Sequence, residues 1–395
     1  MQRKRILVFV SYYLPGYKAG GPVRALANMI ECIGSECDIK IVTRDHDLKE
    51  RKPYSGVQPG QWNKVGGQDI FYCPPGMPGL LAIARLIKET PYDILYLNSF
   101  FDPLMSIFPL LCSIPGQGSS QVVVAPHGEF SHNALRLKAL KKTLYIQAAK
   151  LAGFYNDVTW HTSTEYEAKD LRNAFPRTKD SNIKIARNLA GGAISCSRND
   201  KKRQGELKII FLSRISRMKN LAYALDLLRT ASGNVRFDIY GPLEDSAYFE
   251  HCRSIMEALP PNVEANYLGA TNADKVVPTF MEYDLLLLPT LGENFCHVIA
   301  EALSAGCPVL VSDETPWRNL ADHGVGWELP LAQPELWKEK LQYMVDMGWE
   351  EHHAMSKSAL EFFKNHCNDR NAIEQNLNLF LPSRTEALPP PSSVG

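Results

Sequence analysis

The stretch "YDLLLLPTLGENFCHVIAEALSAGCPVLVSD", residues 283–313, alternates between strand-like and helix-like patterns. It opens with "YDLLLLPT" and closes with "CPVLVSD", two short apolar runs of the kind that form buried strands. The segment between them, which starts near Asn294, has the spacing of an amphipathic helix. A strand, a helix and a second strand in this order predict a parallel sheet covered by helices.

The same alternation runs along the whole chain. Short aliphatic runs such as "RILVFV", "CDIKIVT" and "QVVVAPHG" are separated by amphipathic ones such as "PVRALANMIECIG". A second series starts at "LKIIFLSR", and 395 residues are enough for two cores of typical size. We therefore predict an α/β fold of two Rossmann-like doubly wound domains.

Changes in composition mark the expected domain boundaries. Residues 1–190 form the first domain, and the polar, aperiodic stretch 191–206 forms a linker. Residues 207–360 form the second domain. We expect residues 361–395 to hold a helix that crosses back to the first domain, followed by a loose Pro- and Ser-rich tail.

Composition excludes several classes of protein. The 43 basic and 43 acidic residues cancel, so net charge does not indicate a nucleic-acid partner. The nine cysteines are odd in number and form no CxxC pair, which argues against a disulfide framework and a zinc module. The most apolar stretch, residues 100–116, contains Asp102 and internal prolines and is too short to cross a bilayer. A cytoplasmic location is expected.

Ligands of open parallel sheets bind at the carboxyl ends of the strands. Gly20 and Gly21 follow the first strand and precede a helical pattern that begins near Val23. A helix N-terminus favours an anion, although an ordinary turn also uses glycine. Arg214 and Lys219 follow a strand of the second series, where they suit either a diphosphate or a solvated basic loop.

Glu293 and Glu301 begin and end the segment "ENFCHVIAE". Eight residues span about 12 Å along a helix, so the two carboxylates can touch one long ligand such as a nucleotide-sugar. The backbone N–H groups of Asn294, Phe295 and Cys296 would point toward that ligand. Glu293 equally suits a plain acidic residue at a helix start.

These motifs together resemble the retaining GT-B glycosyltransferases of family 4 (glycosyl transferases group 1), notably those of bacterial surface-polysaccharide assembly. The resemblance rests on E-x7-E followed by "ALSAGCPVLVSD", on "FLSRISRMKN" upstream, and on the Gly-Gly loop, "PHGEFS", "TSTEYE" and "IARN" in the first half. It covers nearly the whole chain. It implies two domains facing across a cleft, with a nucleoside-diphosphate-sugar donor held mainly by the second domain and the acceptor by the first.

The resemblance also implies roles for individual residues. It assigns the diphosphate to Arg214 and Lys219, the ribose to Glu301, and the donor sugar to Glu293 and the N–H groups after it. Gly20 and Gly21 would approach the donor phosphate or the acceptor. His127 matches a histidine near the reacting sugar, although alone it would suit a structural loop. The predicted catalytic residues are His127, Arg214, Lys219 and Glu293; the predicted donor-binding residues are Gly20, Gly21, Arg214, Lys219, Glu293, Asn294, Phe295, Cys296 and Glu301.

Two features depart from simple expectations. Many relatives have glycine where this chain has Cys296, and a cysteine there would alter backbone freedom and sugar selection. A Cys296–His297 dyad is not expected, because adjacent helix residues point about 100° apart.

The "DHD" at 45–47 is interpreted as loop charge or an acceptor contact. Cationic side chains and helix N-termini would offset the leaving diphosphate, so neither a metal nor another cofactor is expected.

The predicted function is a metal-independent hexosyl- or glycosyltransferase of EC 2.4 type. It would move a sugar from a UDP- or GDP-sugar to a saccharide or polyprenyl-linked acceptor in polysaccharide, O-antigen (lipopolysaccharide) or exopolysaccharide biosynthesis. A nucleotide-sugar epimerase or hydrolase, or a catalytically silent nucleotide-sugar-binding scaffold, remain alternatives. The basic amphipathic segment 133–156 suits either peripheral contact with anionic lipid at the inner face of the plasma membrane or an ordinary surface helix.

Overall fold

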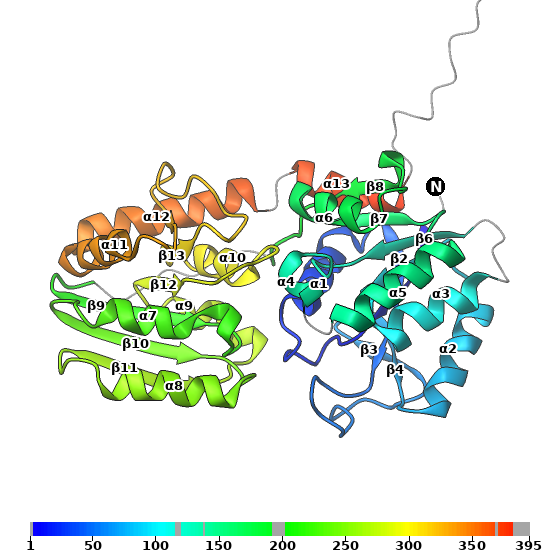
Figure 1. The fold of residues 1–395 in the computed structure, drawn as a ribbon, viewed down its shortest axis with the longest axis horizontal. Coiled ribbons are helices and arrows are strands. Elements are labelled where there is room, and N and C mark those ends of the chain that lie inside the picture. Colours follow the sequence, from blue (N-terminus) through cyan, green and yellow to red (C-terminus); the bar gives the residue numbers. More distant parts are fainter. Residues whose placement is uncertain (1–2, 115–119, 137–138, 192–201, 368–369, 382–395) are drawn as a thin grey trace, which may run out of the picture. The chain divides into compact units, whose positions relative to one another are not determined.

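The computed structural model describes residues 3–114, 120–136, 139–191, 202–367 and 370–381 (Figure 1). The chain divides into two compact units. One holds Met1–Leu189 with the segment that begins at Arg370, and the other holds Ala190–Asp369. The boundary expected at residue 360 falls inside helix α12 (Trp349–His366), which belongs wholly to the second unit. Most of the expected linker, residues 192–201, lies outside the described residues.

The sheet of the first unit has, within the described residues, eight strands in the order β3-β4-β2-β1-β5-β6-β7-β8. All neighbours are parallel except β3 and β4. The strands are β1 (Lys4–Val10), β2 (Cys37–Arg44), β3 (Trp62–Val65), β4 (Gln68–Cys73), β5 (Ile94–Asn98), β6 (Gln121–Ala125), β7 (Thr159–Thr162) and β8 (Ile183–Ile185).

Both faces of this sheet are buried, because alternate residues of one strand feed two separate cores. In β1, Leu7 and Phe9 belong to one cluster of buried side chains, whereas Ile6, Val8 and Val10 belong to another. This is why the strands read as continuous apolar runs. The helices are α1 (Gly21–Ile33), α2 (Met77–Glu89), a π-helix (Pro103–Ile107), α3 (Phe108–Ser113), α4 (His132–Arg136), α5 (Ala139–Ala152), α6 (Glu165–Ala174) and α13 (Arg370–Phe380).

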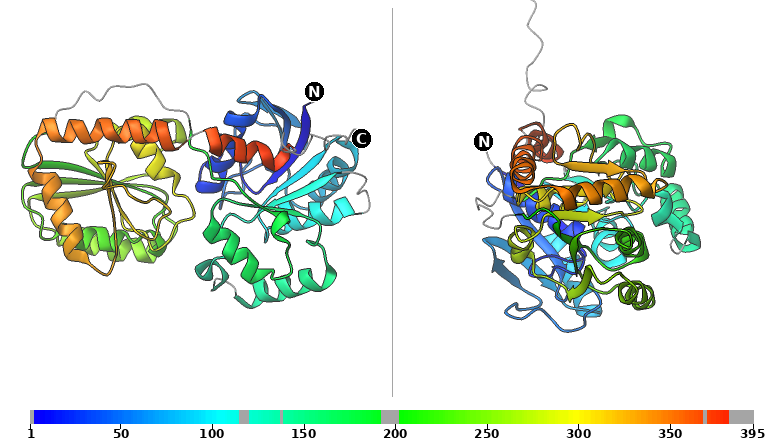
Figure 2. Two further views of the ribbon diagram at one scale, coloured as in Figure 1. Left: turned by 90° about the horizontal axis from the view of Figure 1, so that it is seen from above. Right: turned by 90° about the vertical axis from the view of Figure 1, so that its left-hand side faces the viewer.

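Helix α13 packs beside α1 in the first unit (Figure 2). The Asn376 amide donates to the backbone oxygen of Arg187 at 2.8 Å, and the Lys184 ammonium donates to the oxygen of Asn378 at 2.6 Å. Leu379 and Phe380 complete the core that contains α1. The described end of the chain is therefore part of the first unit.

The sheet of the second unit is parallel throughout, in the order β11-β10-β9-β12-β13-β14. Its strands are β9 (Glu206–Leu212), β10 (Asn234–Tyr240), β11 (Val263–Gly269), β12 (Leu285–Leu288), β13 (Val309–Ser312) and β14 (Gly326–Leu329). Its helices are α7 (Leu221–Leu228), α8 (Ser246–Glu257), α9 (Val276–Phe280), α10 (His297–Ser304), α11 (Pro334–Asp346) and α12. The two-unit α/β fold predicted from the sequence is confirmed.

Two strands were not predicted, and one helix start was predicted wrongly. Strand β3 forms a hairpin with β4 through Gly66 and Gly67, whose φ angles of 58° and 82° suit a tight two-residue turn. The Gly66–Gly67 pair was the feature of the sequence that could have predicted this hairpin. Strand β14 was also missed. Helix α10 begins at His297 and not near Asn294, so Glu301 lies only just over one turn into it.

None of the helices in the described part of the chain combines the length and the apolar composition that crossing a bilayer requires.

Candidate functional site

The second unit places its predicted site residues where the strand order of its sheet reverses. Strand β9 lies between β10 and β12, so the chain winds outward from β9 in one direction and from β12 in the other. The loops that follow β9 and β12 lie at the carboxyl ends of these strands, where such sheets usually have their ligand crevice. Arg214 and Lys219 follow β9, and Glu293 follows β12.

Lys219 and Glu293 form an ion pair across this crevice. Each side chain is only 12% exposed, so the pair is largely shielded from water. The two loops are also joined by backbone, because the Leu291 N–H donates to the Met218 oxygen at 2.8 Å. The Thr290 hydroxyl donates to the same oxygen at 3.1 Å. The fold therefore brings together two residues that are 74 positions apart in sequence.

Arg214 is directed elsewhere. Its guanidinium donates to the carboxylate of Glu244, which follows β10, at 2.8 Å. Both side chains are 39% exposed, and a pair with that much access to water contributes little to stability. Arg214 and Lys219 thus lie in the same loop but hold different carboxylates.

Cys296 sits at the start of α10 in a left-handed conformation, with φ 65° and ψ 71°. This backbone turn is the reason that α10 begins one residue later and that Asn294 and Phe295 lie in the preceding loop. The Phe295 oxygen accepts a hydrogen bond from the Trp317 indole at 2.6 Å. Burial, and after it the charge of Glu293, raises the pKa of the Cys296 thiol well above its ordinary value. The thiol therefore stays protonated at neutral pH and is a poor nucleophile.

Glu301 is half-buried on α10. Its charge acts on the Cys296 thiol in the same direction as that of Glu293. The structure thus gathers Lys219, Glu293, Cys296 and Glu301 around one strand-end crevice. It does not place the two glutamates on a single helix, because Glu293 precedes α10.

The first unit has a pocket of about 170 Å³ at the equivalent reversal of its own sheet. There β1 and β5 are neighbours, and the chain winds outward from them in opposite directions. The wall includes residues that follow β1, β5 and β6 and residues around the start of α1. Those with polar side chains are Ser11, Tyr12, Asn98, Ser99, His127 and Glu129.

His127 is held by the end of β5. Asn98 donates through its amide to the Phe9 oxygen at 3.3 Å, which turns its own oxygen toward His127 Nε2 at 3.1 Å. The neutral ring therefore carries its proton on Nε2. Burial lowers the pKa of His127 from 6.5 to about 4, although the charge of Glu167 opposes this shift. The imidazole is accordingly neutral at physiological pH.

Glu167 was not among the predicted site residues, yet it fixes the loop that carries His127. It lies on α6, is 4% exposed, and accepts a hydrogen bond from the Gly128 N–H at 2.6 Å. Its second oxygen accepts from the backbone and hydroxyl of Ser163 at 2.7 and 2.8 Å. These bonds hold His127 and Gly128 at φ angles of 50° and 78°. "TSTEYE" was the only sequence signal.

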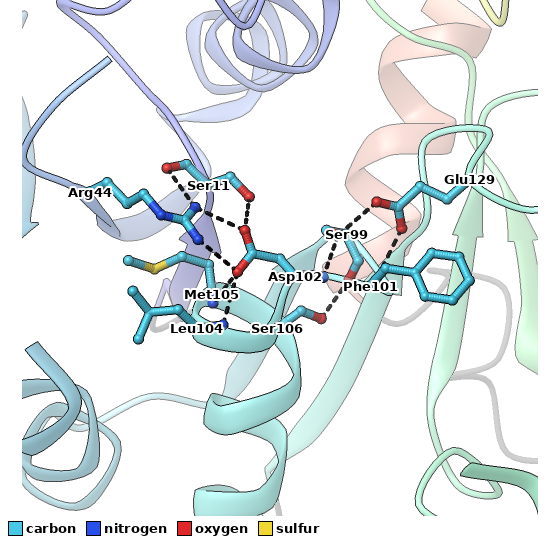
Figure 3. Close-up of polar contacts among 9 residues, drawn as sticks. All are labelled: Ser11, Arg44, Ser99, Phe101, Asp102, Leu104, Met105, Ser106 and Glu129. Atoms are coloured by element: carbon cyan, nitrogen blue, oxygen red, sulfur yellow. Dashed lines mark hydrogen bonds and ion pairs between the residues drawn. The ribbon is translucent and has the colours of Figure 1, made fainter. Parts of the chain in front are cut away.

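A second unpredicted cluster fixes the ends of β1, β2 and β5 (Figure 3). The Arg44 guanidinium donates to both oxygens of Asp102 at 2.8 and 2.9 Å and to the Ser11 backbone oxygen at 3.2 Å. The Ser11 hydroxyl also donates to Asp102. Burial raises the pKa of Asp102, but Arg44, the Ser11 hydroxyl and the Met105 N–H together outweigh burial and leave the pKa below its ordinary value. Three strand ends are thereby tied to one carboxylate.

Glu129, which follows β6, binds the loop after β5 in the same region. It accepts hydrogen bonds from the Ser99 hydroxyl at 2.8 Å and from the backbone N–H of Phe101 at 3.2 Å (Figure 3). It also accepts one from the backbone N–H of Phe100 at 2.6 Å. Burial raises the pKa of this carboxyl. The bonds orient the loop after β5, which forms part of the pocket wall.

The predicted Gly-Gly loop opens α1. Gly20 has φ 69°, and a side chain at Gly20 or Gly21 would meet nothing within 4 Å, so the backbone is open on that side. Asp47 of the "DHD" segment anchors the loop by accepting bonds from the N–H groups of Tyr17 and Lys18 at 2.9 and 3.2 Å. The carboxylate at position 47 therefore positions the loop. Among the described residues, His, Cys, Asp and Glu side chains do not gather in threes as a metal site requires.

Comparisons with known proteins bear on the family of the second unit and on the fold. Residues 196–362 match the family model for glycosyl transferases group 1. An uncharacterised 41.2 kDa protein in the cps region of Klebsiella pneumoniae is 24% identical over 240 residues, or 59% of this chain. The match spans 63% of that relative's own length.

Several solved structures share the fold over nearly the whole chain. Anabaena Alr3699/HepE in complex with UDP and glucose has a TM-score of 0.68 at 15% identity, covering 95% of this chain and 98% of that one. Sucrose-phosphate synthase from Thermosynechococcus elongatus has a TM-score of 0.70 at 12% identity, covering 96% and 98%. WaaG, a glycosyltransferase involved in lipopolysaccharide biosynthesis, has a TM-score of 0.65 at 14% identity, covering 96% and 100%. The fold is the GT-B type with two Rossmann-like units, and the family match supports a transferase.

The pKa of His127 predicts a loss of stability in acid. In the unfolded chain His127 binds a proton near pH 6.5, whereas in the folded chain it binds one only near pH 4. The neutral ring therefore makes its full contribution to the unfolding free energy above pH 6.5, and this contribution is lost as the pH falls toward 4. His127→Gln should flatten this decline in unfolding free energy by about 1–3 kcal/mol. Urea unfolding between neutral pH and pH 4 measures it. The exposed His251→Gln is the control, and equal slopes for both variants would contradict the prediction.

The left-handed backbone of Cys296 makes a second prediction. Cys296→Gly and Cys296→Ala both remove the thiol, but only glycine adopts positive φ without steric cost. The glycine variant should therefore unfold at a free energy about 1 kcal/mol higher than the alanine variant. Denaturant unfolding at one pH compares them. Alanine equal to or above glycine would show that position 296 is not strained.

Proposed function

We propose that this protein is a retaining glycosyltransferase of EC 2.4 type that moves a hexosyl or related sugar from a UDP- or GDP-sugar to a saccharide or polyprenyl-linked acceptor. Its place would be in polysaccharide, O-antigen or exopolysaccharide biosynthesis. The observation that carries the proposal is the shielded Lys219–Glu293 pair at the strand-order reversal of the unit that matches glycosyl transferases group 1. The relatives named for UDP and for lipopolysaccharide biosynthesis give the substrate class its support.

The donor diphosphate would bind beside Lys219. In the ligand-free pair, Glu293 already offsets the lysine charge, so a diphosphate competes with Glu293 and frees the carboxylate for the hydroxyls of the donor sugar. Arg214 would exchange its exposed contact with Glu244 for the same diphosphate, since that pair is weak. Glu301 would accept hydrogen bonds from the ribose. The loop Asn294–Cys296 would lie along the sugar, and the side chain at 296 would narrow the space for it.

The acceptor would bind in the first unit, in the pocket beside His127 and the open Gly20–Gly21 backbone. A neutral His127 with its proton on Nε2 leaves Nδ1 as an acceptor for a sugar hydroxyl. A charged imidazolium could not accept such a bond, which gives the lowered pKa of His127 a chemical use.

The transfer itself would retain the anomeric configuration. The bond between the anomeric carbon and the leaving phosphate oxygen breaks, and the acceptor oxygen bonds to that carbon on the same face. The acceptor proton passes to the leaving phosphate oxygen. Cys296 does not qualify as a nucleophile, because its thiol remains protonated. We propose that cationic side chains offset the diphosphate charge without a metal, and the enzyme would then keep its activity in a chelator such as EDTA.

Substitution of the crevice residues tests this assignment. Lys219→Ala should lower kcat by about two or more orders of magnitude, because it removes charge that offsets the leaving group. Glu301→Ala should mainly weaken donor binding, seen as a smaller thermal shift with the best nucleotide-sugar of a UDP and GDP panel. Release of UDP or GDP, with and without short oligosaccharide acceptors, reports turnover.

Controls separate chemistry from folding. Lys219→Ala leaves the Glu293 carboxylate shielded from water without its partner, which destabilises the fold. The double variant Lys219→Met, Glu293→Gln removes both charges, so comparison with it shows how much of the lost turnover in Lys219→Ala comes from destabilisation. Near-normal turnover in Lys219→Ala would overturn the site. Nucleotide release that acceptors leave unchanged would instead indicate a hydrolase, and interconversion of the donor without release would indicate an epimerase. A product of inverted configuration by NMR would reject retention.

We further propose that the protein works in the cytoplasm against the inner face of the plasma membrane, through α5. This helix exposes Leu140 (75%), Leu144 (62%) and Leu151 (89%), which lie within about 40° of one another around the helix axis. The exposed Lys141 lies beside them. An apolar stripe next to a lysine suits an anionic lipid surface, where a polyprenyl-linked acceptor would also reside.

Vesicle binding tests the membrane contact. The protein should sediment with phosphatidylglycerol vesicles at low ionic strength more than with phosphatidylcholine vesicles. Leu144→Asp should reduce that binding about tenfold, because a carboxylate opposes both burial and the lipid charge. The control is Leu81→Asp on α2, where the side chain is 65% exposed. Equal binding of both variants and the unmodified protein would reject α5 as the contact.

A further inference from the structure

A second pocket of the first unit lies apart from the residues discussed so far. It has a volume of about 380 Å³, within the range of small-molecule sites, and it lies between the sheet and the end of α2. Residues from β2, from the start of β3 and from the end of α2 line it, among them Lys40, Gln61, Trp62, Arg85 and Glu89. It shares no lining residue with the pocket beside His127.

The register of the sheet explains why these side chains meet. Phe71 of β4 pairs with Trp62 on one side and with Val42 on the other, so the three point to one face. Lys40, two residues before Val42, points to that face as well. The antiparallel strand β3 is therefore what adds an aromatic wall to this part of the sheet.

Charge in the pocket is not balanced. Lys40 is half-buried and, within the described part of the chain, forms no ion pair; its ammonium lies 5.5 Å from the centre of the Trp62 ring. Arg85 has only a loose contact with Glu89, 3.8 Å between side chains that are 58% and 67% exposed. Two cations thus face one carboxylate that is free to move in water. A partly buried ammonium that faces an aromatic ring instead of a carboxylate keeps its charge uncompensated, and it favours an anionic ligand.

The exposed ring of Trp62 indicates which class of anionic ligand fits the pocket. Trp62 remains 36% exposed although its ring packs against Phe71, with 5.6 Å between ring centres. Lys40 lies over part of the ring, and the exposed remainder of the indole offers an apolar surface for the C–H groups of a sugar ring. The Gln61 amide nitrogen donates to Gln58, which leaves the side-chain oxygen of Gln61 to accept hydrogen bonds from hydroxyls. The guanidinium fork of Arg85 matches a carboxylate. A free inorganic anion would use the cations but not the indole.

We propose that this pocket binds a carboxylate-bearing sugar unit of a saccharide chain, with the carboxylate between Lys40 and Arg85 and the ring against Trp62. The choice of a saccharide rests on the proposed function, because an acceptor or product chain must lie along the protein during transfer. The site deepens that function by giving the saccharide substrate a chemical class, an acidic glycan.

The test follows the Trp62 indole signal in a ¹H–¹⁵N NMR spectrum of the full-length chain, assigned by its loss in Trp62→Phe. A hyaluronan tetrasaccharide, which carries glucuronate, should move this signal. The neutral maltotetraose and inorganic phosphate should not. Lys40→Gln should weaken tetrasaccharide binding about fivefold, the value of one partly shielded charge contact.

Lys64→Gln is the matched control. Lys64 lies on β3 close to the pocket but does not line it, is 73% exposed, and pairs with Asp69 at 3.2 Å. Its substitution should change the dissociation constant by less than about twofold. The proposal is overturned if the tetrasaccharide leaves the indole signal unmoved, if maltotetraose or phosphate moves it equally, or if both lysine variants lose the same affinity.

Thermal shifts with UDP and nucleotide-sugars on the same samples keep this result separate from the proposed function. Lys40→Gln should respond to nucleotides like the unmodified protein, since Lys40 belongs to the first unit and is remote in sequence from the crevice of the second. Absence of any nucleotide response, with tetrasaccharide binding intact, would reject the transferase and leave the acidic-saccharide site standing.

Discussion

Where neighbouring parallel strands send their following segments in opposite directions, the carboxyl ends of those strands form the usual ligand site of the sheet. Both sheets contain such a place, between β1 and β5 in the first unit and between β9 and β12 in the second. The groups that matter here gather at these two places because every strand end there delivers its next residue to the same edge. The pocket beside His127 and the Lys219–Glu293 pair therefore result from the same rule of strand order.

The Lys219–Glu293 pair places two charges where they are shielded from water. Shielding two charges from water is unfavourable unless each finds its partner, and removal of one leaves the other uncompensated. The pair is therefore kept together by the fold, through the backbone contact between Met218 and Leu291. A ligand with its own negative charge can take the place of Glu293 on the lysine.

Strained backbone occurs where these loops begin. Non-glycine residues with positive φ include Ser99 after β5, His127 after β6, and Cys296 before α10. Each costs on the order of 1 kcal/mol and persists only where surrounding bonds impose it. For His127 those bonds come from Glu167 and Asn98, and for Ser99 from Glu129. The polar residues behind the pocket are therefore as necessary to its shape as those that line it.

The sequence alone predicts the fold class, because strands buried on both faces must be continuously apolar and the helices between them amphipathic. It also placed Arg214, Lys219 and Glu293 beyond the carboxyl ends of two strands, because each lies in the segment that follows an apolar run. Tertiary structure decided what those residues touch. Periodicity could not show that Arg214 pairs with Glu244 and Lys219 with Glu293. It could not show that α10 begins only at His297. It also gave no sign that Glu167 and Arg44 position loops that are far from them in sequence. Local patterns report the direction of each side chain from its own strand or helix, whereas a partner is chosen by the packing of elements that are distant along the chain.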